Sequence, residues 1–355
     1  MRRPIEDPGL RVVAERLAAQ LLSGPRAATA EGVAEHLLAI QAQDPRGARL
    51  AVRARTEGLS ASAVDHALSV ERSLLITSLG RGTLHLVRAE DYPWLQALTT
   101  PPLRSGSARR LAQEGVSPGA TERGVAVIER SLAEEGPLSR AQLRDRIAAA
   151  GVRTEGQAFI HVLFEASLRG LIVRGPMIGS DHAFALVRDG LGAPAPVQRD
   201  RALAELARRY LRGHGPAADR DLARWAGIPL RDARGGLERI ASELVQRPDG
   251  LVDLRSRAAA EAPLPPPRLL GAFDPLLHGW CSREAILQEH KQIVTANGVF
   301  RPFALVRGRA VAIWSIRAGA ITISPFGRLA IRDLAALEAD ARDVRRFLED
   351  DAGPA

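Results

Sequence analysis

Both ends of a short helix are specified within residues 139–151, SRAQLRDRIAAAG. Ser139 is a favourable N-cap, because its hydroxyl can accept a hydrogen bond from the first turn, and Gly151 can adopt the left-handed conformation that closes a helix. We therefore expect a helix over residues 140–150. The elements on either side of this helix predict the architecture of the chain.

One helix precedes it, and a helix and a hairpin follow. Residues 121–135 are predicted to be helical, and residues 155–169 carry apolar side chains at helical spacing. Gly170 ends that third helix. Residues 171–173 and 183–187 then have the composition of two strands around a glycine-rich turn. Three helices followed by a hairpin are the order of a winged helix.

The same order occurs twice more, which gives three copies along the chain. The third copy is expected to have helices at 199–213, 218–226 and 230–242, with strands at 244–246 and 251–254. The looser first copy is expected to have helices at 10–22, 30–43 and 60–68, with strands at 74–78 and 83–87. An all-α protein with a few hairpins would look similar, but three agreeing copies favour tandem winged helix-turn-helix units and an α+β fold.

A different segment follows the proline-rich stretch 263–267, PLPPP, which we interpret as a stiff hinge. Strands are expected at 268–273, 298–306, 310–316 and 320–324, and a helix at 332–348. Arg307-Gly308 and Ala318-Gly319 are the predicted turns. This pattern predicts a small antiparallel sheet or β-barrel. The four expected segments are thus 1–118, 119–196, 197–262 and 263–355.

Positive charge dominates the composition. The chain has 355 residues, a formal net charge of +8 and a sequence pI of about 10.9. Lys291 is its only lysine, so nearly every cation is a guanidinium, a group that pairs bidentately with phosphate. Mutational bias in a GC-rich genome would also enrich arginine. The charge nevertheless suits a polyanionic partner.

Several classes of protein are excluded by what the sequence lacks. Cys281 is the single cysteine, and the eight histidines are scattered without metal-ligand spacing, so we expect no disulfide, metal or cofactor. No apolar run follows the N-terminal arginines, and none approaches the ~20 residues that a membrane helix needs. We therefore expect a cytoplasmic protein without a membrane partner. We also expect a monomer.

The strongest candidate site is residues 40–46, IQAQDPR. Gln41 and Gln43 can hold a water molecule or a sugar oxygen by hydrogen bonds, but neither amide can take up a proton near neutral pH. A reaction that they serve must depend on positioning more than on base strength. Because Pro45 disfavours a helical conformation at Asp44, we expect the helix to end near Gln43. Polar residues at the end of a helix are the simpler interpretation of this pair.

Several motifs together resemble the AlkZ and YcaQ group of bacterial DNA glycosylases. They are residues 38–45, LAIQAQDP; 81–85, RGTLH; 273–277, FDPLL; 297–302, NGVFRP; Gly308-Arg309; and Trp314. The resemblance spans nearly the whole chain. It implies three tandem winged helices and a C-terminal β-barrel that form a C-shaped, basic concave surface for duplex DNA.

The resemblance also implies an activity, the removal of N7-alkylated guanine, including bulky or cross-linked antibiotic adducts. Gln41 and Gln43 are then the catalytic residues and place the chain in the Gln-x-Gln branch, which resembles self-resistance enzymes of antibiotic producers. Alkylation at N7 gives guanine a positive charge, so the base leaves without an enzymatic acid. Amide dipoles that place water at C1′ and stabilise an oxocarbenium-like sugar are then sufficient.

Further residues are expected to contact the DNA: Arg46, Arg49, Arg53, Arg81, Thr83, His85, Asn297 and Arg301. Arg81 stands at a predicted hairpin tip, where it could reach into a groove. A half-buried His85 that binds a backbone group is an equally good interpretation. Lys291, the only lysine that could form a Schiff base, lies outside the Gln-x-Gln region, so base release without strand cleavage is expected.

Two other functions are compatible with the sequence. A transcription regulator with winged helices would use residues 155–169 and 230–242 as recognition helices. A catalytically inactive homologue that binds lesions is the third possibility. The motifs do not separate azinomycin, trioxacarcin and pluramycin adducts, and a bulky single-site adduct of the pluramycin hedamycin is our preferred substrate.

Overall fold

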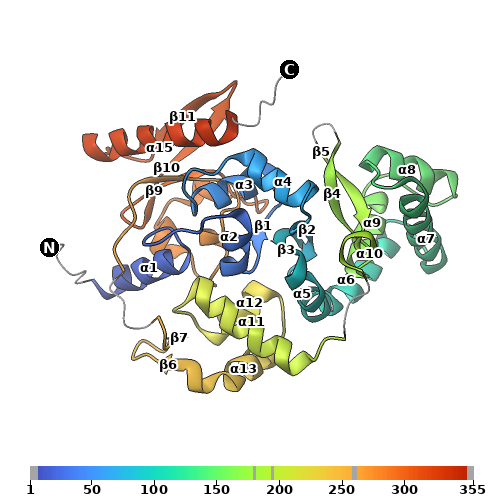
Figure 1. Ribbon diagram of the computed structural model, residues 1–355, viewed down its shortest axis with the longest axis horizontal. Helices are drawn as coiled ribbons and strands as arrows, with labels where there is room; N and C mark the ends of the chain where they lie inside the picture. The colour runs from blue at the N-terminus through green and yellow to red at the C-terminus, as the bar shows by residue number, and fades with distance from the viewer. Residues whose placement is uncertain (1–6, 179–180, 193–195, 258–261, 350–355) are drawn as a thin grey trace. The chain divides into compact units, whose positions relative to one another are not determined.

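The computed structural model describes residues 7–178, 181–192, 196–257 and 262–349 (Figure 1). The chain forms two compact units. The first unit contains Met1–Asp65, Leu203–Trp225 and Pro229–Ala355, and the second contains His66–Ala202 and Ala226–Ile228. These bounds cut across the four predicted segments, because each unit combines stretches that are distant in sequence.

The second unit is built on an antiparallel sheet with the strand order β3-β2-β4-β5. Its strands are β2 (Leu74–Leu79), β3 (Thr83–Arg88), β4 (Ile172–Ile178) and β5 (Asp181–Leu186). Both predicted hairpins are confirmed, although part of the β4–β5 turn lies outside the described residues. Pairing of Ile76 with Arg174 joins the two hairpins into one sheet, a link that the sequence did not indicate.

Helices pack beside this sheet around one apolar core (Figure 1). The predicted three-helix order appears as α7 (Pro118–Glu135), α8 (Arg140–Ala149) and α9 (Ala158–Leu168). Ser139 and Gln142 form a capping box at the start of α8. Four further elements were not predicted: η1 (Ala89–Asp91), α5 (Tyr92–Thr99), α6 (Pro101–Gln113) and α10 (Val187–Leu191).

The N-terminal part of the chain contains α1 (Pro8–Ala19), α2 (Ala30–Leu37), β1 (Ile40–Gln41), α3 (Pro45–Arg53) and α4 (Ala61–Ser69). The elements of the third predicted copy are present in the expected order. They are α11 (Arg199–His214), α12 (Asp219–Ala226), α13 (Leu230–Arg239), η2 (Ala241–Glu243), β6 (Leu244–Gln246) and β7 (Val252–Leu254). Helical periodicity and capping therefore located most helices correctly.

The C-terminal strands form an antiparallel sheet with the order β11-β10-β9-β8. They are β8 (Arg268–Leu270), β9 (Phe303–Val306), β10 (Arg309–Arg317) and β11 (Ala320–Pro325), accompanied by η3 (Pro275–Leu277), α14 (Glu284–Leu287), η4 (Lys291–Ile293) and α15 (Ile331–Glu349). Positive φ angles at Arg307-Gly308 and Ala318-Gly319 agree with the predicted turns. Within the described residues β8 and β11 remain edges, so a closed barrel is not confirmed.

The proline-rich stretch does not isolate this sheet from the N-terminal helices. A Cβ on Gly308, in the β9–β10 turn, would lie 2.9 Å from a methyl carbon of Val13 on α1. Arg53 on α3 likewise pairs with Asp340 on α15. The C-terminal sheet and the segment that carries Gln41 and Gln43 therefore belong to one packed unit.

Candidate active site

The Gln-x-Gln motif, Gln41 to Gln43, does not lie on a helix. α2 ends at Leu37, the next residue Leu38 has a φ of +68°, and β1 begins at Ile40. The prediction that this helix continues to Gln43 is wrong. Leu37, Leu38 and Ile40 are all fully buried, and on a continuing helix Leu38 would point away from the face that Leu37 and Ile40, three residues apart, would share. Ending the helix lets all three enter the core.

Helix α11 fixes the point at which α2 ends. Arg209 donates hydrogen bonds from Nε and Nη2 to the carbonyl oxygen of Glu35, at 3.2 and 2.6 Å. A cation is favourable there because the last carbonyl groups of a helix carry partial negative charge. A Cβ on Gly213 would lie 2.8 Å from the carbonyl oxygen of His36, so glycine permits this close approach.

The extended backbone changes the relation between the two amides. On a helix the two side chains would diverge by about 200°, but the structure places Gln41 in a strand and Gln43 in the bend that follows it. Gln41 is 6% exposed, and its Oε1 has no hydrogen-bond partner among the described residues. Gln43 follows the strand and is exposed. The motif thus combines a buried, unsatisfied acceptor with a second amide at the surface.

Helix α3 begins directly after the motif and was missed in the sequence. Asp44 is its N-cap and accepts a 2.6 Å hydrogen bond from the backbone N–H of Gly47, with Pro45 in the first turn. Asp followed by Pro is a start signal for a helix, and it also predicts the end of a preceding helix, which is the only meaning that was assigned to it from the sequence. A Cβ on Gly47 would lie 2.3 Å from the carbonyl oxygen of Ala272, so glycine lets α3 rest on the C-terminal segment.

The three arginines predicted on this segment have different environments. Arg46 is exposed at the start of α3. Arg49 is 7% exposed and forms an ion pair with Asp65, while Arg53 is 2% exposed. Burial removes Arg49 and Arg53 from contact with a phosphate, so we withdraw them as DNA-binding residues. Arg46 stays a candidate.

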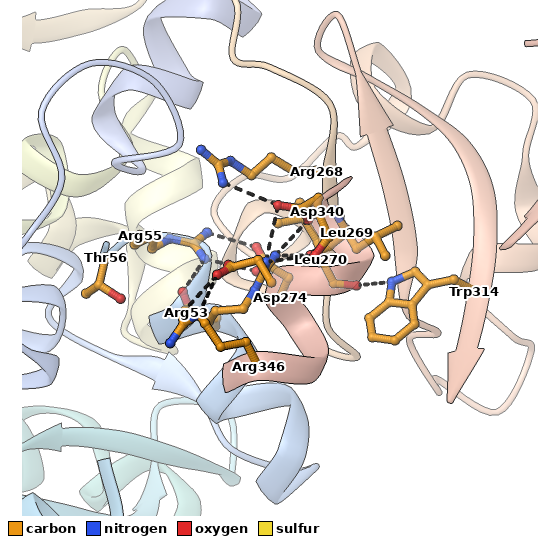
Figure 2. Close-up of polar contacts among 12 residues, drawn as sticks. Arg53, Arg55, Thr56, Arg268, Leu269, Leu270, Asp274, Trp314, Asp340 and Arg346 are labelled. Atoms are coloured by element: carbon orange, nitrogen blue, oxygen red, sulfur yellow. Dashed lines mark hydrogen bonds and ion pairs between the residues drawn. The ribbon is translucent and has the colours of Figure 1, made fainter. Parts of the chain in front are cut away.

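Buried arginines anchor the end of α3 to the C-terminal part of the chain (Figure 2). Arg53 donates from Nη2 to Asp340 and to the carbonyl oxygen of Leu269, both at 2.9 Å. Arg55 pairs with Asp274 through two hydrogen bonds of 2.9 and 2.8 Å, and both side chains are fully buried. Sequence reasoning missed these positioning residues, since nothing local distinguishes a buried arginine from an exposed one.

Arg81, Thr83 and His85 belong to the β2–β3 hairpin of the second unit. Arg81 is exposed in the turn, between glycines that both have positive φ. His85 is half-buried, and its Nδ1 lies 2.9 Å from the carbonyl oxygen of Thr83. Burial, and to a lesser degree the charge of Arg81, lowers the pKa of His85 to about 4, although the backbone hydrogen bond opposes the shift. His85 is therefore neutral near pH 7, as its interpretation as a backbone-bound strand residue implies.

Asn297 and Arg301 lie in the segment that precedes β9, and both are exposed. Between them Phe300 is buried, with its ring 4.2 Å from that of His278 and 5.5 Å from that of Phe273. The aromatic rings hold this loop against the protein while its polar side chains face outward. Both residues stay candidates for contact with DNA.

The sequence predicts neither a metal site nor a membrane-spanning helix. The described part of the chain contains no group of three or more His, Cys, Asp or Glu side chains arranged to hold a metal ion. None of its helices combines the length and apolarity needed to cross a lipid bilayer.

Comparison with known proteins gives a consistent result. A family model described as "DNA glycosylase AlkZ-like" matches residues 34–347. The "Interstrand DNA cross-link repair glycosylase" of Streptomyces sahachiroi is 27% identical over 359 residues, covering 94% of this chain and 95% of the relative. The solved structure of the Streptomyces sahachiroi DNA glycosylase AlkZ has a TM-score of 0.77 and 26% identity, with 97% of each chain covered.

Proposed function

The chain belongs to the AlkZ-like family of DNA glycosylases, and we propose that it hydrolyses the N-glycosidic bond of N7-alkylguanine in duplex DNA, leaving an abasic site. Its substrates are bulky or cross-linked adducts. The relative from Streptomyces sahachiroi is named for interstrand cross-link repair, which supports a large lesion. Within this class we propose the pluramycin type, such as hedamycin, as the physiological adduct and self-resistance as the role.

The environment of the Gln-x-Gln motif carries the proposal. Gln41 presents an unsatisfied acceptor from a buried strand, while Gln43 offers a second amide two residues along. A water molecule that donates to the oxygen of an amide is oriented without being deprotonated. Gln41 and Gln43 thus direct water at C1′, and their dipoles stabilise the positive charge that develops on the sugar.

The substrate supplies the rest of the chemistry. N7-alkylguanine is cationic, so the electron pair of the breaking C1′–N9 bond neutralises the ring as the base departs. The attacking water then adds to C1′ and loses its proton to solvent. No acid, metal or covalent nucleophile is needed, so we propose a monofunctional, cofactor-free enzyme that acts as a monomer in the cytoplasm.

Substitution of each glutamine tests this assignment. Gln41→Ala and Gln43→Ala should each lower the single-turnover rate of N7-methylguanine release by about 100-fold or more, as removal of one placed hydrogen-bonding group in an active site typically does. Affinity for the duplex and the unfolding midpoint should change little. Gln113→Ala removes an exposed glutamine outside the motif and should behave as wild type. Unchanged rates in both motif variants would refute the assignment.

The same assay separates the two alternatives. A transcription regulator is not supported, because the family and the curated relative are both glycosylases. An inactive lesion-binding homologue would bind adducted duplex but release no base. Alkali-labile abasic sites, formed by wild type and lost in both glutamine variants, would exclude it.

A further inference from the structure

A pocket of about 220 Å³ opens beside the Gln-x-Gln motif, entirely within the first unit. Asp44 and Arg46 of the α3 start form one side of it. Pro302, Trp314 and Ile316, from the C-terminal sheet and the residues leading into it, form the other side. Asp44 directly follows Gln43, and consecutive Cα atoms are about 3.8 Å apart. The pocket therefore begins one residue from a proposed catalytic amide.

The lining is mostly apolar, and its polar side chains are Asp44, Arg46 and the exposed Ser315. Trp314 is 4% exposed, and its indole N–H donates a 2.9 Å hydrogen bond to the carbonyl oxygen of Leu270, which fixes the ring as a floor. Ile316 lies two residues further along β10 and is half-buried. Residues two apart on a strand share a face, so both side chains turn toward α3. Arg46 is exposed at the opposite edge.

The glycines at the contact between α3 and the C-terminal segment keep this pocket in place. A Cβ on Gly271 would lie 3.0 Å from the carbonyl oxygen of Gly47, and a Cβ on Gly47 would lie 2.3 Å from that of Ala272. The two backbones touch directly there. This contact sets the spacing between α3 and the C-terminal segment beside the pocket.

We propose that this pocket receives the apolar, ring-containing part of the substituent on guanine N7. The inference rests on the proposed function and names which substituents its site accepts. Its volume is below the roughly 300–1,000 Å³ of sites that hold drug-sized ligands, so it accommodates one end of an adduct rather than a whole intercalator. A methyl group on N7 is too small to use it. Ile316 and Trp314 are thus specificity-determining residues.

Paired substrates and paired variants test the pocket. Ile316→Trp places a larger side chain in the pocket, at a half-buried position near the end of β10. Ile313→Trp makes the same exchange at a half-buried position on the opposite face of β10. Single-turnover release is measured from duplexes that carry N7-methylguanine or an N7-guanine adduct with a polycyclic aromatic substituent. Steric discrimination in an apolar pocket is typically about 10- to 200-fold.

Ile316→Trp is expected to slow release of the aromatic adduct by at least about tenfold while N7-methylguanine release stays within about twofold. Ile313→Trp should leave both rates near wild type. An equal loss of release rate on both substrates, or no loss on either, would contradict the proposal that the pocket binds the substituent.

Binding gives a second readout that does not depend on turnover. The ratio of affinities for aromatic-adduct and N7-methyl duplexes should fall in Ile316→Trp and not in Ile313→Trp. If wild type releases neither base, the proposed function is wrong. The ratio of affinities still tests whether the pocket binds the aromatic substituent.

Discussion

Arg55 and Asp274 form a bidentate ion pair in which neither side chain is exposed to solvent, with Nη1–Oδ2 and Nη2–Oδ1 distances of 2.9 and 2.8 Å. Arg55 stands just after α3, and Asp274 caps η3 by accepting a hydrogen bond from the backbone N–H of Leu276. Gln20 also accepts a hydrogen bond from Arg55. The pair joins the segment after the proposed catalytic motif to the C-terminal part of the chain.

Asp274→Asn is expected to destabilise the protein strongly. The substitution leaves the Arg55 guanidinium buried without a counter-charge, and breaking a buried pair in this way typically costs about 3–5 kcal/mol. Chemical denaturation followed by circular dichroism measures the loss. Asp343→Asn is the control, because Asp343 is partly exposed where it meets Arg53 and should cost about 1 kcal/mol or less. Equal effects of the two substitutions would contradict a structural role for the Arg55 pair.

Stability should fall as the pH drops from about 6.5 toward 4. His214 is fully buried, which lowers its pKa to about 3 despite the hydrogen bond to the carbonyl oxygen of Tyr210. Burial also lowers the pKa values of His36 and His85 to about 4. The unfolded chain protonates these groups near pH 6.5, whereas the folded chain does not. Protons therefore favour unfolding throughout this window.

His214→Asn tests this linkage, because its amide nitrogen can replace the donor at Nδ1 without ionising. It should lower stability at pH 7 through lost packing, yet reduce the slope of unfolding free energy between pH 6 and 4 by up to about 1.4 kcal/mol per pH unit. A slope that does not respond to the His214 substitution would show that the histidine is protonated in the folded state.

Arg46→Gln and Arg81→Gln are each expected to flatten the salt dependence of binding to undamaged duplex. Every guanidinium–phosphate contact contributes about 0.9 to the log–log slope, because binding releases condensed counterions. Fluorescence anisotropy over a salt series measures the slopes. Arg53→Gln is the contrasting variant, since its guanidinium is buried and ion-paired. Arg53→Gln should lower stability without changing the salt-dependence slope for DNA binding by the folded protein. A wild-type slope near zero would mean that the net charge reflects amino-acid composition and not contacts with DNA phosphates.

The DNA strand should stay intact after base release, and excess EDTA should leave the rate unchanged. Lys291 lies in η4, apart in sequence from the Gln-x-Gln motif, and no other lysine is present to form a Schiff base. Borohydride should therefore trap no covalent enzyme–DNA product on denaturing gels. A trapped product that disappears in Lys291→Ala would instead place the chemistry in the C-terminal segment.

Features that depend on a few neighbouring residues were predicted well. Ser139 caps α8 as expected, and the turn at Arg307-Gly308 follows from the backbone freedom of its glycine. The β2–β3 hairpin has the expected turn, with Leu79 paired to Thr83. Such features are local because their hydrogen bonds join residues close in sequence, and the same chemistry acts in any fold.

The ends and partners of other elements depended on distant segments. α2 stops at Leu37 because the helix that carries Arg209 and Gly213 abuts its last carbonyl groups, more than 170 residues away in sequence. From helical periodicity alone, the helix was predicted to continue to Gln43. The link between the two hairpins through Ile76 and Arg174 is similarly long-range.

Local sequence thus sufficed for most helices and for the hairpins, although α3, α5, α6 and α10 were missed, and the motifs sufficed for the family. Folding alone decided that Gln41 is buried on an extended strand while Gln43 is exposed, and that Arg46 faces solvent while Arg53 pairs with Asp340. The reason is that helix propensity and capping act between near neighbours, whereas burial and ion pairing depend on which remote surfaces meet.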